Sequence, residues 1–184
     1  MIEVETKFRS PGNDKVRKAL TKLGAKEISS GAMEDVYFGH PARDFGKTDE
    51  ALRLRKLQDG AELTYKGPRM QTESSKAREE ITLRTDNPLA AQRIVERLGF
   101  KESFVLRKHR TSFMLDKLRI DVDLVDDLGE FVELEVLTES PDRAMALMET
   151  ARKELGLEKP EPKTYLELLI EKQSGDKAKR PDAA

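Results

Sequence analysis

The sequence predicts an α+β fold, an antiparallel eight-stranded sheet closing into a barrel or tunnel, with helices packed on the outside. Three observations lead to this prediction. Several segments alternate apolar and charged residues with the period of two that is typical of strands. Turn residues separate some neighbouring strands closely enough for hairpins. Longer segments show apolar residues at helical spacing and end at a Leu-Gly pair, as helices often do.

The composition sets limits on the class of protein. Of 184 residues, 37% are hydrophobic and 38% are charged, and we expect one domain over residues 1–172 and a disordered polar tail over 173–184. With 34 Lys and Arg against 35 Asp and Glu, a broad basic surface for duplex nucleic acid is not expected. The longest apolar run has five residues, far too short to cross a membrane, so we expect a cytoplasmic protein. A homodimer is compatible with a small enzyme.

The first predicted strand, residues 2–9, places Glu3, Glu5 and Lys7 on one face. Residues on the same face of a strand lie about 6.6 Å apart, so two carboxylates come beside one ammonium group. This spacing suits a divalent metal next to a phosphate. The alternative is an ordinary surface strand whose charges face water.

The remaining elements follow from alternation, helical spacing and capping signals. We expect further strands over residues 35–38, 51–57, 62–66, 76–84, 103–114, 117–125 and 130–137. We expect helices over residues 14–23, 88–98, 141–155 and 164–172, and a loop over 40–50. The last helix is predicted to pack through Leu166, Leu169 and Ile170.

The predicted polar strand faces carry same-sign charges two residues apart. These pairs are Glu3 and Glu5, Arg53 and Arg55, Lys108 and Arg110, Asp121 and Asp123, and Glu133 and Glu135. Like charges on one face cost stability unless a ligand or a neighbouring strand compensates them. Turned inward, these faces would form a tunnel with acidic and basic walls. Such walls suit a polyphosphate held by Arg and Lys, with Mg²⁺ or Mn²⁺ between the carboxylates. The alternative is an internal network of salt bridges.

At these residues the sequence resembles a known family. The segment Glu3-Val4-Glu5-Thr6-Lys7 is similar to the ExExK signature of the CYTH superfamily, the triphosphate tunnel enzymes. Further similar motifs follow in the family's order, at residues 51–55, 63–68, 77–80, 108–110 and 128–135, so the resemblance extends from residue 2 to about 170. Segments 35–38, 40–45 and 48–53 look most like the class IV adenylate cyclase branch.

The resemblance implies metal-binding, catalytic and phosphate-binding residues. It implies a metal site for Mg²⁺ or Mn²⁺ formed by Glu3, Glu5, Asp121, Glu133 and Glu135, with Asp123 beside them, and a catalytic role for Glu3, Glu5, Glu133 and Glu135. It implies that the triphosphate is held by Lys7, Arg53, Arg55, Lys66, Arg78, Lys108 and Arg110. Glu80 is expected to pair with this basic wall.

The resemblance implies an enzyme that acts on a nucleoside triphosphate or on another organic or inorganic triphosphate. The leading hypothesis is a cyclase that forms 3′,5′-cyclic AMP and pyrophosphate from ATP. The second is a triphosphatase for tripolyphosphate, thiamine triphosphate or an RNA 5′ end. Because both reactions use the same walls, the sequence leaves the choice open. A third hypothesis is a sensor that binds a triphosphate without turnover.

Overall fold

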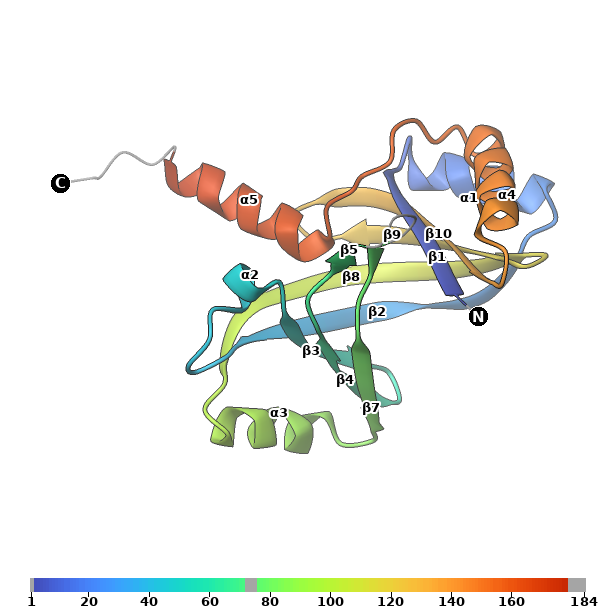
Figure 1. The fold of residues 1–184 in the computed structure, drawn as a ribbon. Coiled ribbons are helices and arrows are strands. Elements are labelled where there is room, and N and C mark those ends of the chain that lie inside the picture. The colour runs from blue at the N-terminus through green and yellow to red at the C-terminus, as the bar shows by residue number, and fades with distance from the viewer. Residues whose placement is uncertain (1, 72–75, 179–184) are drawn as a thin grey trace. The chain divides into compact units, whose positions relative to one another are not determined.

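The computed structural model describes residues 2–71 and 76–178, which form ten strands and five helices (Figure 1). The strands are β1 (Ile2–Arg9), β2 (Lys26–Gly39), β3 (Ala51–Leu57), β4 (Gly60–Lys66), β5 (Met70–Gln71), β6 (Lys76–Ala77), β7 (Glu80–Thr85), β8 (Lys101–Leu115), β9 (Leu118–Val125) and β10 (Gly129–Thr138). The helices are α1 (Asn13–Lys22), α2 (Phe45–Thr48), α3 (Pro88–Arg97), α4 (Pro141–Glu154) and α5 (Tyr165–Ala178).

Eight strands form one sheet in the order β1-β10-β9-β8-β2-β3-β4-β7, while β5 and β6 pair separately. Six of its strand pairs are antiparallel. They are β1 with β10, β10 with β9, β9 with β8, β2 with β3, β3 with β4, and β4 with β7. The predicted eight-stranded antiparallel sheet with helices is therefore confirmed. Its order ends at β1 and β7, so within the described residues hydrogen bonds do not close it into the predicted barrel.

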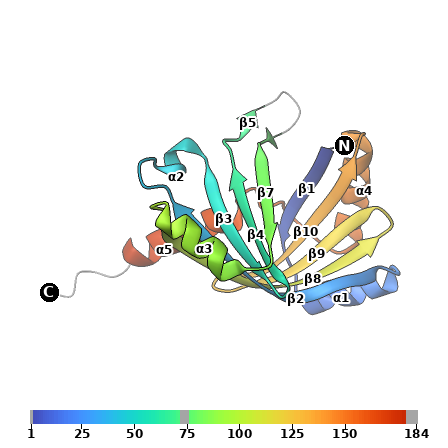
Figure 2. The same ribbon diagram turned by 90° about the horizontal axis from the view of Figure 1, so that it is seen from below.

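The contacts between residues divide the chain into two units. Unit 1 comprises residues 1–31 and 108–184, and unit 2 comprises residues 32–107. Strands β2 and β8 run through both units. Figure 2 shows β1, β10 and β9 side by side in the first unit, and β3, β4 and β7 side by side in the second.

Unit 1 buries the apolar face of its strands under α1 and α4. Ile120 of β9 and Leu134 of β10 are fully buried in one cluster with Val16 and Leu20 of α1 and Met148 of α4. These residues are the apolar half of each alternating pattern, so the charged half must lie on the other face. Helices thus cover the apolar face, as the sequence predicted.

Unit 2 has the same arrangement with α3 as the covering helix (Figure 1). Val36 and Leu54 are buried with Val95 of α3. The helix begins where predicted, because Pro88 occupies its first turn and the Asn87 side chain accepts a hydrogen bond from the Ala90 backbone N–H at 3.0 Å.

Some element boundaries differ from the prediction. Strand β2 begins at Lys26, whereas the prediction began at residue 35. The prediction missed the first half of the strand because that half is largely exposed and lacks the alternation that a buried face produces. The predicted strand over 76–84 divides into β6 and β7 around Arg78. A short helix, α2, interrupts the predicted loop over 40–50, with Asp44 as its N-cap.

The last helix differs from its prediction in length and packing. α5 continues to Ala178, beyond the predicted end at residue 172, and residues 179–184 of the predicted tail lie outside the described residues. Tyr165, Leu168 and Leu169 are buried, whereas Ile170 is 38% exposed, so the expected packing of Ile170 is wrong. Among the described helices, none is long and apolar enough to cross a membrane.

Candidate active site

In unit 1, the ladder register places most of the predicted site residues on one face of the sheet. Directly opposed residues in an antiparallel pair point to the same side. Glu133 of β10 lies opposite Lys7 on one side and Asp121 on the other, and Glu135 lies opposite Glu5. With β8 included, this unit 1 charged face carries Glu5, Lys7, Lys108, Arg110, Asp121, Asp123, Glu133 and Glu135.

Arg110 lies at the centre of the unit 1 charged face and is 8% exposed. Its Nε donates to Asp123 Oδ1 at 2.7 Å, and its Nη2 donates to Asp123 Oδ2 at 2.6 Å. The same guanidinium pairs with Asp121 and Glu133. Burial by itself lowers the pKa of Arg110, but the hydrogen bonds to Asp123 and the nearby carboxylates raise it above its usual value. Arg110 therefore stays charged and joins three strands.

Asp123 is fully buried and is bound by several donors. Besides Arg110, Lys108 Nζ donates to its carboxylate at 2.9 Å, and the Tyr165 hydroxyl donates at 2.9 Å. Asn13, a helix cap by its position in the sequence, is instead the first residue of α1, and its Nδ2 donates to the Asp123 backbone carbonyl at 2.9 Å. Burial raises the pKa of Asp123, but the hydrogen bonds and charges of Arg110 and Lys108 outweigh burial and lower this pKa to about 2. Its carboxylate is ionised at neutral pH.

Lys7 projects from β1 over the aromatic ring of Tyr165. Its Nζ lies 4.3 Å from the ring centroid, within the range of a cation–π contact. Burial lowers the pKa of Lys7, and the charges of Glu133 and Glu5 partly offset that effect. Tyr165 carries no sequence signal of a site residue, because a single tyrosine at the start of a helix resembles an ordinary packing residue.

The oxygen donors that could hold a divalent metal lie on β1 and β10. Glu5 and Glu135 are ladder partners, so their carboxylates leave the sheet side by side. The side chain of Glu3 lies outside the described part of the structure. Among the described side chains, no group of three acidic, His or Cys residues is arranged to hold a metal. Carboxylates fit Mg²⁺ or Mn²⁺ in chemistry, and Glu3 is the predicted third ligand beside Glu5 and Glu135.

In unit 2, the predicted arginines share a second charged face. Asp35 of β2 lies opposite Arg55 of β3, and Arg55 donates to both Asp35 oxygens at 2.7 Å. Arg53 Nη1 lies 3.9 Å from Asp35 Oδ2. Arg53 Nε is buried and, among the described residues, has no hydrogen-bond partner. A buried N–H without a partner is costly, so Arg53 retains donor capacity for a ligand.

Two further predicted cations of unit 2 already have partners. Lys66 Nζ donates to Glu80 Oε1 at 2.7 Å across the β4–β7 ladder, the pairing expected for Glu80. Arg78 donates from Nε and Nη2 to the Gly67 carbonyl at 2.9 and 2.7 Å, and from Nη2 to the Asp49 carbonyl at 3.0 Å. Arg78 thus connects the segments around Asp49 and Gly67. Phosphate binding by Lys66 and by Arg78 stays a prediction.

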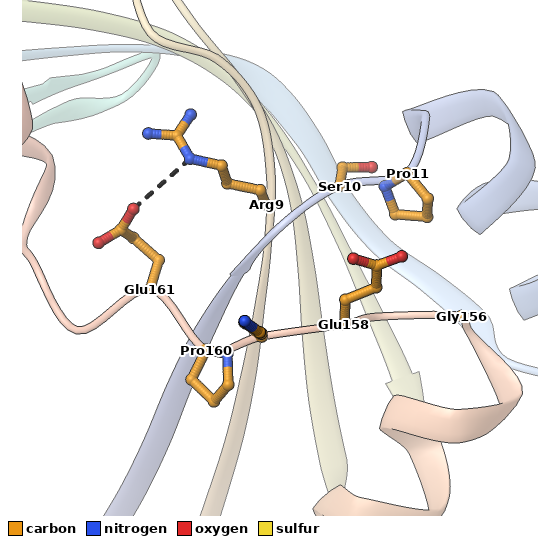
Figure 3. A pocket seen from close by; sticks show the side chains of 8 residues that line it. Arg9, Ser10, Pro11, Gly156, Glu158, Pro160 and Glu161 are labelled. Atoms are coloured by element: carbon orange, nitrogen blue, oxygen red, sulfur yellow. Dashed lines mark ion pairs between the residues drawn. The ribbon is translucent and has the colours of Figure 1, made fainter.

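A separate hollow of 480 Å³ lies beside the end of β1 (Figure 3). Arg9, Pro11 and Pro160 contribute to its lining, and Arg9 Nε lies 3.5 Å from Glu161 Oε2.

The protein is a helix-covered antiparallel sheet whose uncovered strand faces concentrate buried Arg and Lys beside carboxylates. The chain belongs to the CYTH domain family, whose model matches residues 1–166. CYTH family proteins are metal-dependent triphosphate tunnel enzymes.

Individual relatives agree with this assignment. A protein of Methanocaldococcus jannaschii, provisionally named an adenylate cyclase, is 38% identical over 91% of this chain and 98% of its own length. The structure of the PH1819 protein of Pyrococcus horikoshii is similar with a TM-score of 0.79 and 36% identity, covering 93% of this chain and 99% of that one. The structure of a Hippeastrum protein is similar with a TM-score of 0.70 and 20% identity, covering 95% of this chain and 96% of that one. That protein is provisionally named an adenylyl cyclase and is described as having a dominant triphosphatase activity.

Proposed function

We propose that this protein is a class IV adenylate cyclase-like enzyme that converts ATP to 3′,5′-cyclic AMP and pyrophosphate. The observation that carries the proposal is the buried Nε of Arg53, which lacks a partner among the described residues and lies on a charged sheet face. A guanidinium with spare donors binds phosphate oxygens well. The 38% identical relative, whose provisional name is adenylate cyclase, supports the choice of reaction.

In the proposed reaction, the ribose 3′-oxygen forms a bond to the α-phosphorus. The bond from the α-phosphorus to the bridging oxygen breaks, pyrophosphate leaves with the electron pair, and the 3′-hydroxyl proton passes to solvent. The cations proposed to bind phosphate groups are Lys7 in unit 1 and Arg53 and Arg55 in unit 2, because positive charge stabilises a triphosphate and a leaving pyrophosphate. Glu3, Glu5 and Glu135 would hold Mg²⁺ or Mn²⁺, which when bound supplies Lewis acidity at the phosphate oxygens.

A triphosphatase is the second candidate. Here water attacks the terminal phosphorus, so the same cations and metal ligands serve, and only the position of the reacting phosphorus changes. The activity described for the Hippeastrum protein favours this candidate. Its 20% identity shows a common fold alone, so the more similar relative carries greater weight.

The test is product analysis after incubation of the purified protein with ATP and, separately, with tripolyphosphate, each with Mg²⁺ or Mn²⁺. Cyclic AMP plus pyrophosphate would support the cyclase. Free phosphate without a cyclic product would replace it with the triphosphatase, and tight ATP binding without turnover would favour a sensor.

The control pair for this test comes from β3. Arg53→Ala removes a cation from the charged face, and Lys56→Ala removes one from the opposite face, where Lys56 Nζ pairs with Glu34 Oε1 at 2.8 Å. Losing a charge-assisted hydrogen bond costs about 1.5 to 3 kcal/mol, so Arg53→Ala should raise KM about ten- to a hundredfold. An equal effect of Lys56→Ala would contradict binding at the charged face.

A further inference from the structure

Tyr165, the first residue of α5, contacts two of the cations on the unit 1 charged face. Lys7 Nζ lies 4.3 Å and Lys108 Nζ 5.0 Å from the centroid of the same ring. The hydroxyl donates to Asp123 at 2.9 Å, and the ring packs edge-on against Phe131 with 5.0 Å between centroids. The residue is 8% exposed. One side chain therefore meets two ammonium groups and the carboxylate that binds one of them.

The local sequence places this ring at its position. The Glu161 backbone N–H donates to the Lys7 carbonyl at 2.7 Å, which attaches the segment before α5 to β1. Thr164 and Glu167 then form a capping box: the Glu167 backbone N–H donates to the Thr164 hydroxyl at 3.2 Å, and the Thr164 backbone N–H donates to the Glu167 carboxylate at 2.7 Å. The start of α5, and with it Tyr165, is held from both sides.

The two lysines come from strands that are not neighbours. β10 and β9 lie between β1 and β8, and three strand spacings amount to roughly 14 Å along a flat sheet. Two ammonium groups also repel one another. An aromatic ring attracts cations through its quadrupole, at about 0.5–1 kcal/mol when exposed and about 2 kcal/mol or more when desolvated. The shared ring thus offsets part of the cost of bringing Lys7 and Lys108 together.

We propose that Tyr165 is a positioning residue that holds Lys7 and Lys108 together on the unit 1 charged face, so that both ammonium groups meet the same triphosphate. This inference rests on the proposed function for its ligand, while the placement of the lysines rests on geometry alone. A tyrosine that only packs would need the contact with Phe131 but not the two ammonium groups. The experiment must therefore distinguish the contribution of the aromatic ring from that of the hydroxyl group and from that of side-chain packing.

Three variants make this separation. Tyr165→Leu removes the ring and the hydroxyl, Tyr165→Phe keeps the ring, and Leu169→Ala removes a comparably buried side chain from the same helix. In the protein without ligand, an amine-acetylating reagent followed by peptide mass spectrometry measures the reactivity of Lys7 and Lys108. We expect faster labelling of both lysines in Tyr165→Leu, and labelling close to that of the wild type in Tyr165→Phe and Leu169→Ala.

The second measurement uses the β,γ-imido analogue of ATP with Mg²⁺ and calorimetry, followed by turnover of ATP. Tyr165→Leu should bind the analogue about tenfold more weakly, corresponding to about 1.4 kcal/mol of lost cation–π attraction. Its loss should appear in KM more than in kcat, and Tyr165→Phe should recover most of the binding. Equal weakening by Leu169→Ala, or no difference between Tyr165→Leu and Tyr165→Phe, would overturn the proposal.

The two measurements also distinguish the two proposals. If the wild type does not bind the analogue, the proposed function and the meeting of both lysines with a triphosphate are rejected together. If it binds the analogue but Tyr165→Leu leaves labelling and binding unchanged, the positioning role of Tyr165 is rejected and the proposed function stands.

Discussion

The substitution Asp123→Asn tests whether the buried charges of unit 1 stabilise the fold through this one carboxylate. Asp123 is fully buried and accepts hydrogen bonds from Lys108, Arg110 and Tyr165. Asparagine keeps the size of the side chain but removes its charge. The buried ammonium of Lys108 would then face a neutral amide.

The expected loss follows from the partners that remain. Breaking a buried ion pair by removing one partner costs about 3–5 kcal/mol. Arg110 keeps Asp121 and Glu133, so we expect the lower end, about 3 kcal/mol. In a chain of this length each kcal/mol lowers Tm by about 2–4 °C, which predicts a Tm lower by roughly 6–12 °C. Asp126→Asn, an exposed change nearby, should leave Tm nearly unchanged.

The pH dependence gives a second readout with a definite sign. The pKa of Asp123 falls from its usual 3.8 to about 2 in the folded protein, so its contribution is present above about pH 4 and is lost as the pH falls toward 2. This shift corresponds to about 2 kcal/mol. In calorimetric melts, the Tm difference between wild type and Asp123→Asn should therefore narrow between pH 4 and pH 2. A difference that is already absent at pH 7, or that does not narrow in acid, would refute the reasoning.

Three further predictions concern turnover and the fold. Glu135→Gln should lower metal-dependent turnover while Tm in the absence of metal changes by less than a few degrees, because Glu135 is half-buried on the unit 1 charged face and its replacement opens no apolar core; a Tm loss as large as that of Asp123→Asn would instead indicate a structural salt bridge. Treatment with a chelator should abolish turnover, and Mg²⁺ or Mn²⁺ should restore it; turnover that survives chelation would argue against a metal site. Gly60→Ala should lower Tm, since Gly60 has a φ of 145° and an added Cβ would lie 2.4 Å from the Thr85 carbonyl oxygen; a Tm equal to that of the wild type would show that the β3–β4 turn can relax.

Several features of the fold could be predicted because they depend on residues close in sequence. The alternation over residues 51–57 predicted the bounds of β3 without error, and the Asn87-Pro88 signal predicted the start of α3. Parity correctly assigned the charged and apolar faces of β3, β9 and β10, whereas β7 buries neither face. The start of β2 was wrong, because Lys26 and the residues that follow it pair with neighbours without burying one face.

The sequence by itself determined the family, the antiparallel sheet with helices and the strand faces on which charges gather. The tertiary structure decided which charges meet. It brought Lys108, Arg110 and Asp123 into one buried cluster, and it placed Tyr165 against two lysines from strands far apart in the chain. The physical reason is that a period of two relates only residues along a single strand. Contacts between strands depend on their register, which the period does not give. The contact of α5 with the lysines depends on how the chain after β10 returns to β1.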